Sequence, residues 1–292
     1  MYLERFSLPS NSTEIEFIKC EKRTCFNTMY PFKFFPDKEL RKIEFLPLTI
    51  FYGSNGSGKT TLLNVIAQTL FAARQSEFNN SPFFDEYVER CYYEMNKRPR
   101  EIRFISSDDV FDFVLDLRSI NEGIDSRRNE ASDTYFEFKS KMRDPEERRF
   151  RGLEDYDRWK ELRNVASKKN SLSKYVRKNV GKNIDMFSNG ETAMKFFVER
   201  IDENSLYLLD EPENSLSISF QIELAEYIFN SARFFGCQFI IATHSPIFLS
   251  MKKARIYNLD TIPVKVENWT ELENVRKYYE FFKSHEAEFE NC

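Results

Sequence analysis

Glycine, histidine and long apolar runs are scarce in this chain. It has 8 glycines and 2 histidines among 292 residues. No run approaches the roughly 18 apolar residues that a membrane-spanning helix needs, so we expect no membrane segment. The first residues carry charges at Glu4 and Arg5 with no apolar stretch behind them, which argues against a secretory signal. We therefore expect a cytoplasmic protein.

The cysteines and the net charge exclude further classes of protein. The five cysteines include no CxxC pair and have no regular spacing, so neither a disulfide framework nor a zinc site is expected. A formal net charge of −4 gives the whole chain no attraction to nucleic acid. Hydrophobic residues make up 41% and charged residues 31%, which is typical of a globular protein with a sizeable core.

Three of the few glycines lie in one short loop. The segment Gly53-Ser-Asn-Gly-Ser-Gly-Lys-Thr60 fits the phosphate-binding pattern GxxxxGK[ST] between a strand-like run, Leu48–Tyr52, and a helical pattern from Lys59. Glycines let backbone N–H groups surround a phosphate, and the helix N-terminus attracts the same anion. Lys59 can reach the β- and γ-phosphates, and Thr60 can ligate Mg²⁺. The residues expected to bind nucleotide here are Gly53, Ser54, Asn55, Gly56, Ser57, Gly58, Lys59, Thr60 and Thr61.

Two apolar runs farther along end in polar residues. Leu206–Leu209 is followed by Asp210 and Glu211, and Phe239–Ala242 is followed by Thr243 and His244. A carboxylate at a strand end can hold Mg²⁺, which suits Asp210, and the next side chain can polarise an attacking water, which suits Glu211 as general base. We interpret His244 as a γ-phosphate contact, since ligands bind at the carboxyl ends of strands in open α/β sheets. The alternative is a core histidine satisfied by backbone groups.

The segment Phe187-Ser188-Asn189-Gly190-Glu191 precedes the acidic run. With this segment the motif order resembles the ABC-type ATPase superfamily, and within it small "AAA family" ATPases similar to chromosome-maintenance and DNA-repair heads. The resemblance implies an α/β, P-loop NTPase head with a parallel core sheet, an N-terminal antiparallel β part and a helical insertion. It also implies a head-to-tail homodimer around two Mg²⁺·ATP, in which Ser188 and Gly190 complete the partner's site.

Two family features have no clear counterpart. The usual Gln after the strand that follows the first helix is not visible. Ser106–Asp108 stand at the expected position, and Gln75 is a second candidate that follows a helical pattern. The aromatic residue that stacks on adenine is also unassigned, although Tyr30 and Phe32 resemble its placement.

The pattern favours one domain over residues 1–292 with a helical, locally basic insertion at about 118–187. Strand, helix and strand signals at Leu206–Leu209, Ser217–Phe235 and Phe239–Ala242 indicate a parallel α/β core. Further strands are expected at Ile102–Ile105 and around Val110–Leu117, and a charged, aromatic helix is expected from Thr270.

The insertion carries a basic segment. Between Arg158 and Lys182 nine basic residues stand against one acid, Glu161. Such a patch could bind nucleic acid, nucleotide phosphates or an acidic partner, while the alternative is a solvated helical face. Too little chain separates the phosphate loop from Ser188 for a long coiled-coil arm.

The sequence thus predicts an ATPase whose ATP-driven dimer closure gates an effector or regulated partner, such as a nuclease or toxin in defence or repair by analogy of fold. Two alternatives stay open. One is the ATP-binding engine of a membrane transporter, and the other is a nucleotide-gated nucleic-acid clamp with little turnover.

Overall fold

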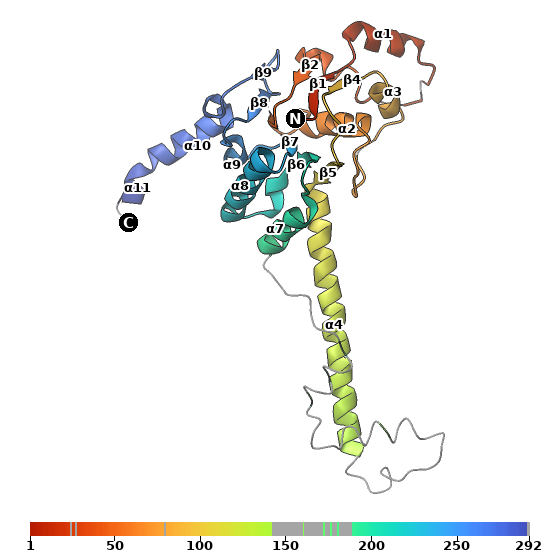
Figure 1. Cartoon of the computed structure of the whole chain (residues 1–292), viewed down its shortest axis with the longest axis vertical. Coiled ribbons are helices and arrows are strands. Elements are labelled where there is room, and N and C mark those ends of the chain that lie inside the picture. Colours follow the sequence, from red (N-terminus) through yellow and green to blue (C-terminus); the bar gives the residue numbers. More distant parts are fainter. Residues whose placement is uncertain are drawn as a thin grey trace. The chain divides into compact units, whose positions relative to one another are not determined.

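The computed structural model describes residues 1–23, 25–26, 28–78, 80–141, 160, 172, 176, 180 and 189–290 (Figure 1). The chain divides into two compact units. One consists of Met1–Phe111 with Asn189–Cys292, and the other of Asp112–Ser188. Within the described ranges, no helix combines the length and the apolar character that crossing a membrane requires.

A six-stranded sheet forms the centre of the first unit. Its strand order is β5-β6-β7-β3-β8-β9, and all neighbours are parallel except β8 and β9, which are antiparallel. Every residue of β3, β6 and β7 is buried, as expected for parallel strands covered on both faces. The strands are β3 (Leu48–Tyr52), β5 (Ile102–Ser106), β6 (Leu206–Asp210), β7 (Gln238–Ala242), β8 (Arg255–Asn258) and β9 (Lys265–Val266). The predicted parallel core is confirmed.

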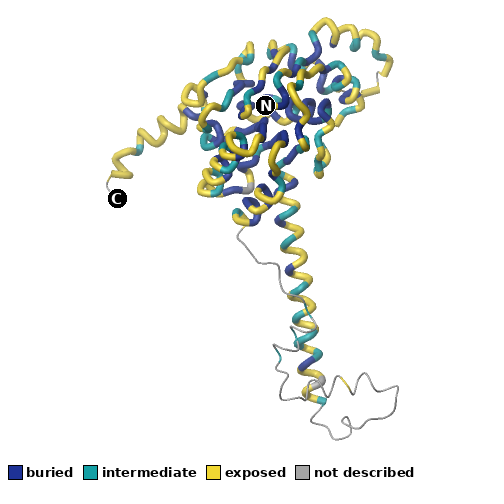
Figure 2. Tube along the Cα trace, in the orientation of Figure 1, coloured by how far each residue is buried: buried dark blue, intermediate teal, exposed yellow. Residues whose placement is uncertain are grey.

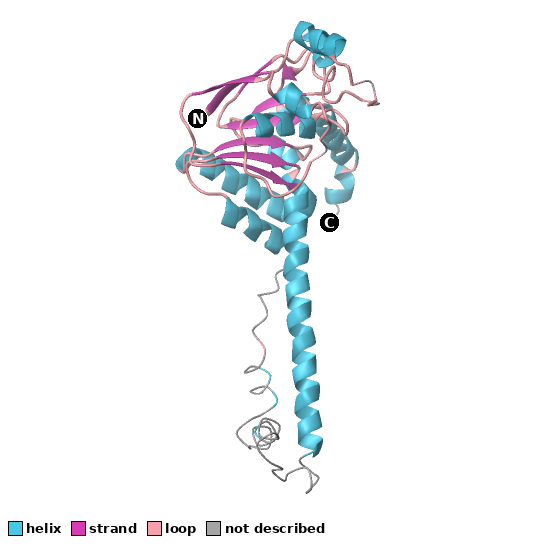
Figure 3. Ribbon diagram, turned by 90° about the vertical axis from the view of Figure 1, so that its right-hand side faces the viewer, coloured by secondary structure: helices cyan, strands magenta, loops and turns pink. Residues whose placement is uncertain are grey.

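Helices pack beside this sheet (Figure 3). The chain passes from β3 directly into α2 (Lys59–Thr69), and from β6 through η3 (Pro212–Ser215) and α8 (Ile218–Phe234) into β7. Helix α7 (Asn189–Arg200) precedes β6, and the short α9 (Pro246–Leu249) follows β7. The loops after β3, β6 and β7 therefore leave the sheet at the same edge, because these strands are parallel neighbours.

A small antiparallel sheet, of order β2-β1-β4, adjoins the core. It is accompanied by α1 (Asn11–Cys20), η1 (Pro36–Lys38) and α3 (Phe84–Val88), and its strands are β1 (Leu3–Ser7), β2 (Lys42–Glu44) and β4 (Tyr92–Met95). The Gln238 side chain ties it to β7, since its Oε1 accepts from the backbone N–H groups of Tyr2 and Leu3 at 2.7 and 2.9 Å. The N-terminal antiparallel part is thus confirmed.

The strand predicted around Val110–Leu117 is wrong, because these residues belong to the helix α4 (Ser107–Lys141). A reciprocal cap starts it: Ser106 N donates to Asp109 Oδ2 at 2.8 Å, and Asp109 N donates to Ser106 Oγ at 3.2 Å. The apolar residues Val110, Val114 and Leu117 then recur at helical spacing. The β-branched and aromatic composition of the run concealed this period.

The C-terminal segment is helical, as predicted. It consists of η4 (Trp269–Glu271), α10 (Glu273–Ser284) and α11 (Glu286–Glu290), and its residues are mostly exposed (Figure 2). In the second unit, Tyr135 of α4 packs against Ala131 and Leu172. Of the basic residues between Arg158 and Lys182, all but Lys160 lie outside the described residues.

Candidate active site

The loop between β3 and α2 requires glycine at two positions. Gly56 and Gly58 have φ angles of 81° and 95°, where side chains with a Cβ are strained. A Cβ on Gly58 would also lie 2.1 Å from Cε1 of Phe34. The aromatic ring thus packs directly on the loop, at the residue that precedes α2.

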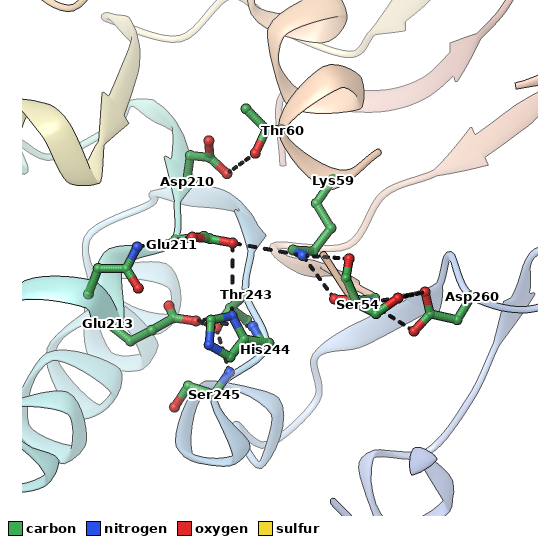
Figure 4. A network of polar contacts seen from close by, with 12 residues as sticks. Ser54, Lys59, Thr60, Asp210, Glu211, Glu213, Thr243, His244, Ser245 and Asp260 are labelled. Carbon is green, nitrogen blue, oxygen red and sulfur yellow. Dashed lines mark hydrogen bonds and ion pairs between the residues drawn. The ribbon is translucent and has the colours of Figure 1, made fainter. Parts of the chain in front are cut away.

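Lys59 is held inside this loop. Its side chain is only 4% exposed, and its Nζ donates to the carbonyl oxygens of Gly53 and Ser54 at 2.8 and 3.2 Å. Glu211 Oε1 lies 3.8 Å from the same Nζ, so the loop after β6 faces the ammonium group (Figure 4). The cation is therefore placed between the loop carbonyls and the acidic strand end.

The loop fits a bound phosphate group. Ser57 Oγ is buried and has no hydrogen-bond partner among the described residues, so a hydroxyl is available there as a donor to an anion. Ser54 is paired instead. Its N–H and its hydroxyl both donate to the Asp260 carboxylate, at 2.8 and 2.9 Å. The sequence offered one signal for Asp260, its position just after a core strand, β8.

Thr60 and Asp210 form an oxygen pair suited to Mg²⁺. The Thr60 hydroxyl donates to Asp210 Oδ1 at 3.1 Å, across from α2 to the end of β6. Burial raises the pKa of Asp210 to about 7, although the Thr60 hydrogen bond and Lys59 act against this shift. Among the described residues, no group of three or more His, Cys, Asp or Glu side chains is placed to hold a metal. A site with two protein oxygens agrees with Mg²⁺, which keeps several water ligands beside phosphate oxygens.

Glu211 has an unusual backbone conformation. Its φ and ψ angles of 47° and 54° lie in the left-handed region, which is uncommon for residues other than glycine and often marks functional sites. Its Oε2 accepts from Asn214 Nδ2 at 2.9 Å, and its Oε1 lies 3.9 Å from His244 Nδ1. The carboxylate is thereby fixed between Lys59 and His244 (Figure 4).

His244 is positioned through its backbone, and its ring is left half exposed. Its N–H donates to Glu213 Oε1 at 3.0 Å, and the same oxygen accepts from the Thr243 hydroxyl at 2.6 Å. The His244 side chain is 47% exposed, with Nδ1 3.4 Å from Glu213 Oε1. The ring is therefore available to a ligand, unlike a buried core histidine. Glu213 was missed from the sequence, although it follows Glu211 by two residues at the strand end.

The glycine of the predicted signature lies in the first turn of α7. A Cβ on Gly190 would lie 2.6 Å from Cδ2 of Phe220 in α8, so this glycine allows the two helices to approach closely. Ser188 lies outside the described residues.

The candidates for the missing glutamine lie next to each other. Ser106 pairs with Asp210 in the β5–β6 register, and its hydroxyl is 2.9 Å from that of Ser76. Gln75 lines a cavity of about 140 Å³ next to Arg74. Ala73 forms a parallel bridge with Arg103 of β5, so Gln75 follows a one-residue strand pairing that no periodicity could show.

The aromatic candidates for adenine are placed differently. Phe32 is buried in the core and stacks on Phe17 with ring centroids 4.5 Å apart, so it is not free to stack on a base. Tyr30 is partly buried, and its hydroxyl donates to Thr61 Oγ1 at 2.9 Å. The ring of Phe34, which the sequence did not single out, packs on the phosphate loop at Gly58.

Comparison with known proteins agrees with this arrangement. The ABC transporter family model matches residues 43–214, more than half of the chain, whereas no curated protein sequence matches. An SMC head domain from Thermotoga maritima is 12% identical, with 88% of this chain and 94% of that chain covered and a TM-score of 0.38.

Two further structures give similar values. An Smc head from Pyrococcus furiosus, bound to the C-terminal domain of ScpA, is 15% identical over 97% of this chain and 99% of that chain, with a TM-score of 0.38. A metal-chelate type ABC transporter is 16% identical, with 80% of this chain and 78% of that chain covered and a TM-score of 0.38. At such identities a likeness says nothing of substrate or partner. The family match and the loop, strand and histidine described above identify the chain as a member of the ABC-type ATPase superfamily.

Proposed function

We propose that this chain is a Mg²⁺-dependent ATPase that closes as a head-to-tail dimer around two ATP molecules. The observation that carries the proposal is the convergence of five side chains at the carboxyl edge of β3, β6 and β7. Lys59, Thr60, Asp210, Glu211 and His244 come from three separate stretches of sequence. They form two neighbouring sets of contacts, Thr60 with Asp210 and Glu211 with both Lys59 and His244 (Figure 4).

Each side chain has a role that its position supports. Lys59 exchanges the loop carbonyls for the β- and γ-phosphates, which are stronger acceptors because they are charged. Ser57 and the N–H groups at the start of α2 surround the same phosphates. Thr60 and Asp210 hold Mg²⁺, which neutralises phosphate charge.

Glu211 acts as the general base. It takes a proton from a water molecule as that water attacks the γ-phosphorus, and the bond to the β,γ-bridging oxygen breaks to give ADP and phosphate. His244 donates a hydrogen bond to the γ-phosphate from its exposed ring. The fixed contacts of Glu211 with Asn214 and of His244 with Glu213 keep both groups oriented before ATP arrives.

The second head supplies the remaining contacts. We place Ser188 and Gly190 of one subunit against the γ-phosphate bound by the other, because donors at a helix N-terminus suit an anion. Hydrolysis removes the γ-phosphate that both heads contact, and the dimer reopens. A partner protein that senses the two states would then be gated by ATP.

The solution mass of Glu211→Gln, with and without Mg²⁺·ATP, tests this proposal. The amide keeps the size of the side chain but cannot accept the proton, so ATP should convert monomer to a stable dimer. Ser188→Arg in the same background should prevent the conversion, whereas Ser12→Arg, on the exposed face of α1, should not.

Two results would count against the proposal. If Glu211→Gln hydrolyses ATP at the wild-type rate, another group is the base. If it binds ATP while its mass never changes, the second head is not a copy of this chain.

A further inference from the structure

An apolar groove lies directly beside the proposed active site. Its cavity has a volume of about 720 Å³ and is bounded by the start of α8, by α9 and by the segment from η4 through α10. Aromatic and aliphatic side chains form most of the wall, namely Ile218, Ile247, Trp269, Tyr278, Tyr279 and Phe282. Glu213 and His244 of the active site belong to the same wall.

Helix α10 is anchored at its beginning. Leu272 and Val275 are buried, and Asn274 N donates to the Tyr52 hydroxyl at 3.3 Å. Beyond this point the rings of Tyr279 and Phe282 are more than half exposed, and Ile218 on the opposite wall is 70% exposed. Neighbouring exposed apolar side chains of this kind are typical of surfaces that bind another molecule.

The wall also contains a carboxylate with one oxygen left unpaired. Glu213 is 6% exposed, and its Oε1 accepts from Thr243 and His244. Its Oε2 is buried and has no hydrogen-bond partner among the described residues. A buried carboxylate oxygen without a donor is costly, so this atom favours a ligand that brings a cationic donor.

The charge around the groove selects the kind of occupant. The wall itself contains the acid Glu213 and the cation Arg276, and the segment from Trp269 to Glu290, part of which forms this wall, carries six acidic side chains against three basic ones. Arg276, the cation of this wall, lies over the Tyr279 ring, 5.7 Å from its centroid. A second copy of this chain would bring the same acidic face to a symmetric contact, and like charges would then meet. A basic segment is complementary.

We propose that this groove binds a basic segment of a partner protein. Aliphatic side chains of the segment cover the rings of α10 and Ile218, and a lysine or arginine lies against the wall beside the Glu213 carboxylate. This surface would be where the proposed ATPase binds the partner that it gates, and this role of the groove rests on the proposed function. The binding itself depends only on the groove.

Fluorescence anisotropy with three labelled peptides and the full chain tests this. The probes are an alternating Leu–Arg peptide, a Leu–Glu peptide of equal length, and a Gly–Arg peptide that has the same charge without the apolar side chains. We expect the Leu–Arg peptide to bind best and to bind more weakly as salt rises. Ile218→Asp and Tyr279→Ser should weaken it by about tenfold or more. Ile222→Asp is the matched control, because Ile222 is exposed on the same helix but outside this groove.

Glu213→Gln should weaken binding of the Leu–Arg peptide and make that binding less dependent on salt. ATP binding is measured separately for each variant with a fluorescent ATP analogue. Ile218→Asp should bind ATP like the wild type, which separates loss of the groove from loss of the fold or of the nucleotide site. If the wild type fails to bind ATP, the proposed function is wrong, but the result of the peptide-binding experiment is unaffected.

The proposal is overturned if the Leu–Glu or Gly–Arg peptide binds as tightly as the Leu–Arg peptide. It is equally overturned if Ile218→Asp leaves binding unchanged. Sedimentation velocity without ATP decides against a partner in a third way. If the chain self-associates under this condition and Ile218→Asp and Tyr279→Ser abolish that association, the occupant of the groove is a second copy.

Discussion

The nucleotide site and the groove beside it share Glu213 and His244, yet their polar groups are satisfied in different ways. In the site, Lys59, Thr60, Asp210 and Glu211 are paired with one another or with backbone carbonyls. In the groove, rings and aliphatic side chains are open to solvent, and one carboxylate oxygen has no donor in the part of the chain that the structure describes.

This difference shows how the same strand ends serve two tasks. Groups that stabilise a developing charge act best when the fold has already oriented them, since they then need no reorganisation during the reaction. A recognition surface gains its binding energy from apolar area that is uncovered until the partner arrives. The side chains of the charged region are therefore already oriented within the chain, whereas the side chains of the apolar region stay uncovered.

Lys59→Ala should affect the nucleotide site alone and give the largest effect. Loss of the charge-assisted bonds to phosphate should weaken ATP binding by about 100-fold. Leu–Arg peptide binding should stay unchanged. Titration with a fluorescent ATP analogue measures the first quantity and anisotropy the second. Lys265→Ala, on the exposed edge strand β9, is the control. Equal ATP affinity in both variants would show that Lys59 does not contribute to ATP binding.

Thr243→Val should disturb both regions, because it removes the hydroxyl that connects them. That hydroxyl donates to Glu213 and accepts from Ser245 N, and both groups are left short of a partner. The free energy of unfolding should fall by about 2 kcal/mol, as measured by urea denaturation. Thr69→Val provides the comparison, since that hydroxyl donates to the Val65 carbonyl within its own helix, and its cost should be clearly smaller. Equal losses would show that the connection contributes nothing of its own.

Glu14→Gln should give the smallest effect, and it separates stability from function. Glu14 in α1 resembles Glu213, since it is buried and its Oε1 has no partner among the described residues, but it lies in neither region. Burial raises its pKa above the ordinary 4.5, although the Lys33 N–H acts against the shift.

The folded protein therefore binds this proton more tightly than the unfolded chain does. The stability from Glu14 is present below pH 4.5 and is lost as the pH rises through the raised pKa. Glutamine does not titrate, so Glu14→Gln should be more stable than the wild type by about 1 kcal/mol at neutral pH. The gain should vanish in acid. Denaturant midpoints at neutral and acidic pH measure this gain. A stability difference between variant and wild type that is equal at both pH values would contradict the raised pKa of Glu14.

Local sequence patterns revealed the parts of the site whose structure is determined by residues close in sequence. The glycine spacing before Lys59 and the apolar runs before Asp210 and His244 predicted the loop and the strands, because backbone geometry and strand burial leave a signal within a few residues. The same reasoning mistook Val110–Leu117 for a strand, since a cap formed by Ser106 and Asp109 decides the element there.

Contacts between distant segments left no such signal. Asp260 meets Ser54, and Glu213 meets Thr243, only because parallel strands end at one edge of the sheet. Gln75 follows a single bridge at Ala73, too short for any period. Phe34, which packs on Gly58, stands in a chain with 30 phenylalanines, where no single ring is distinctive.

The carboxylate of Glu213 has a thermodynamic consequence for these two regions. One of its oxygens accepts from the backbone N–H of His244, and the residue itself belongs to the wall of the groove. Any ligand of the groove that alters the affinity for ATP must have its own affinity altered by ATP by the same factor, because the two binding equilibria form a closed cycle. The size of that factor, measured from either side, is the coupling between the two regions, and its change in Glu213→Gln is the share that this side chain transmits.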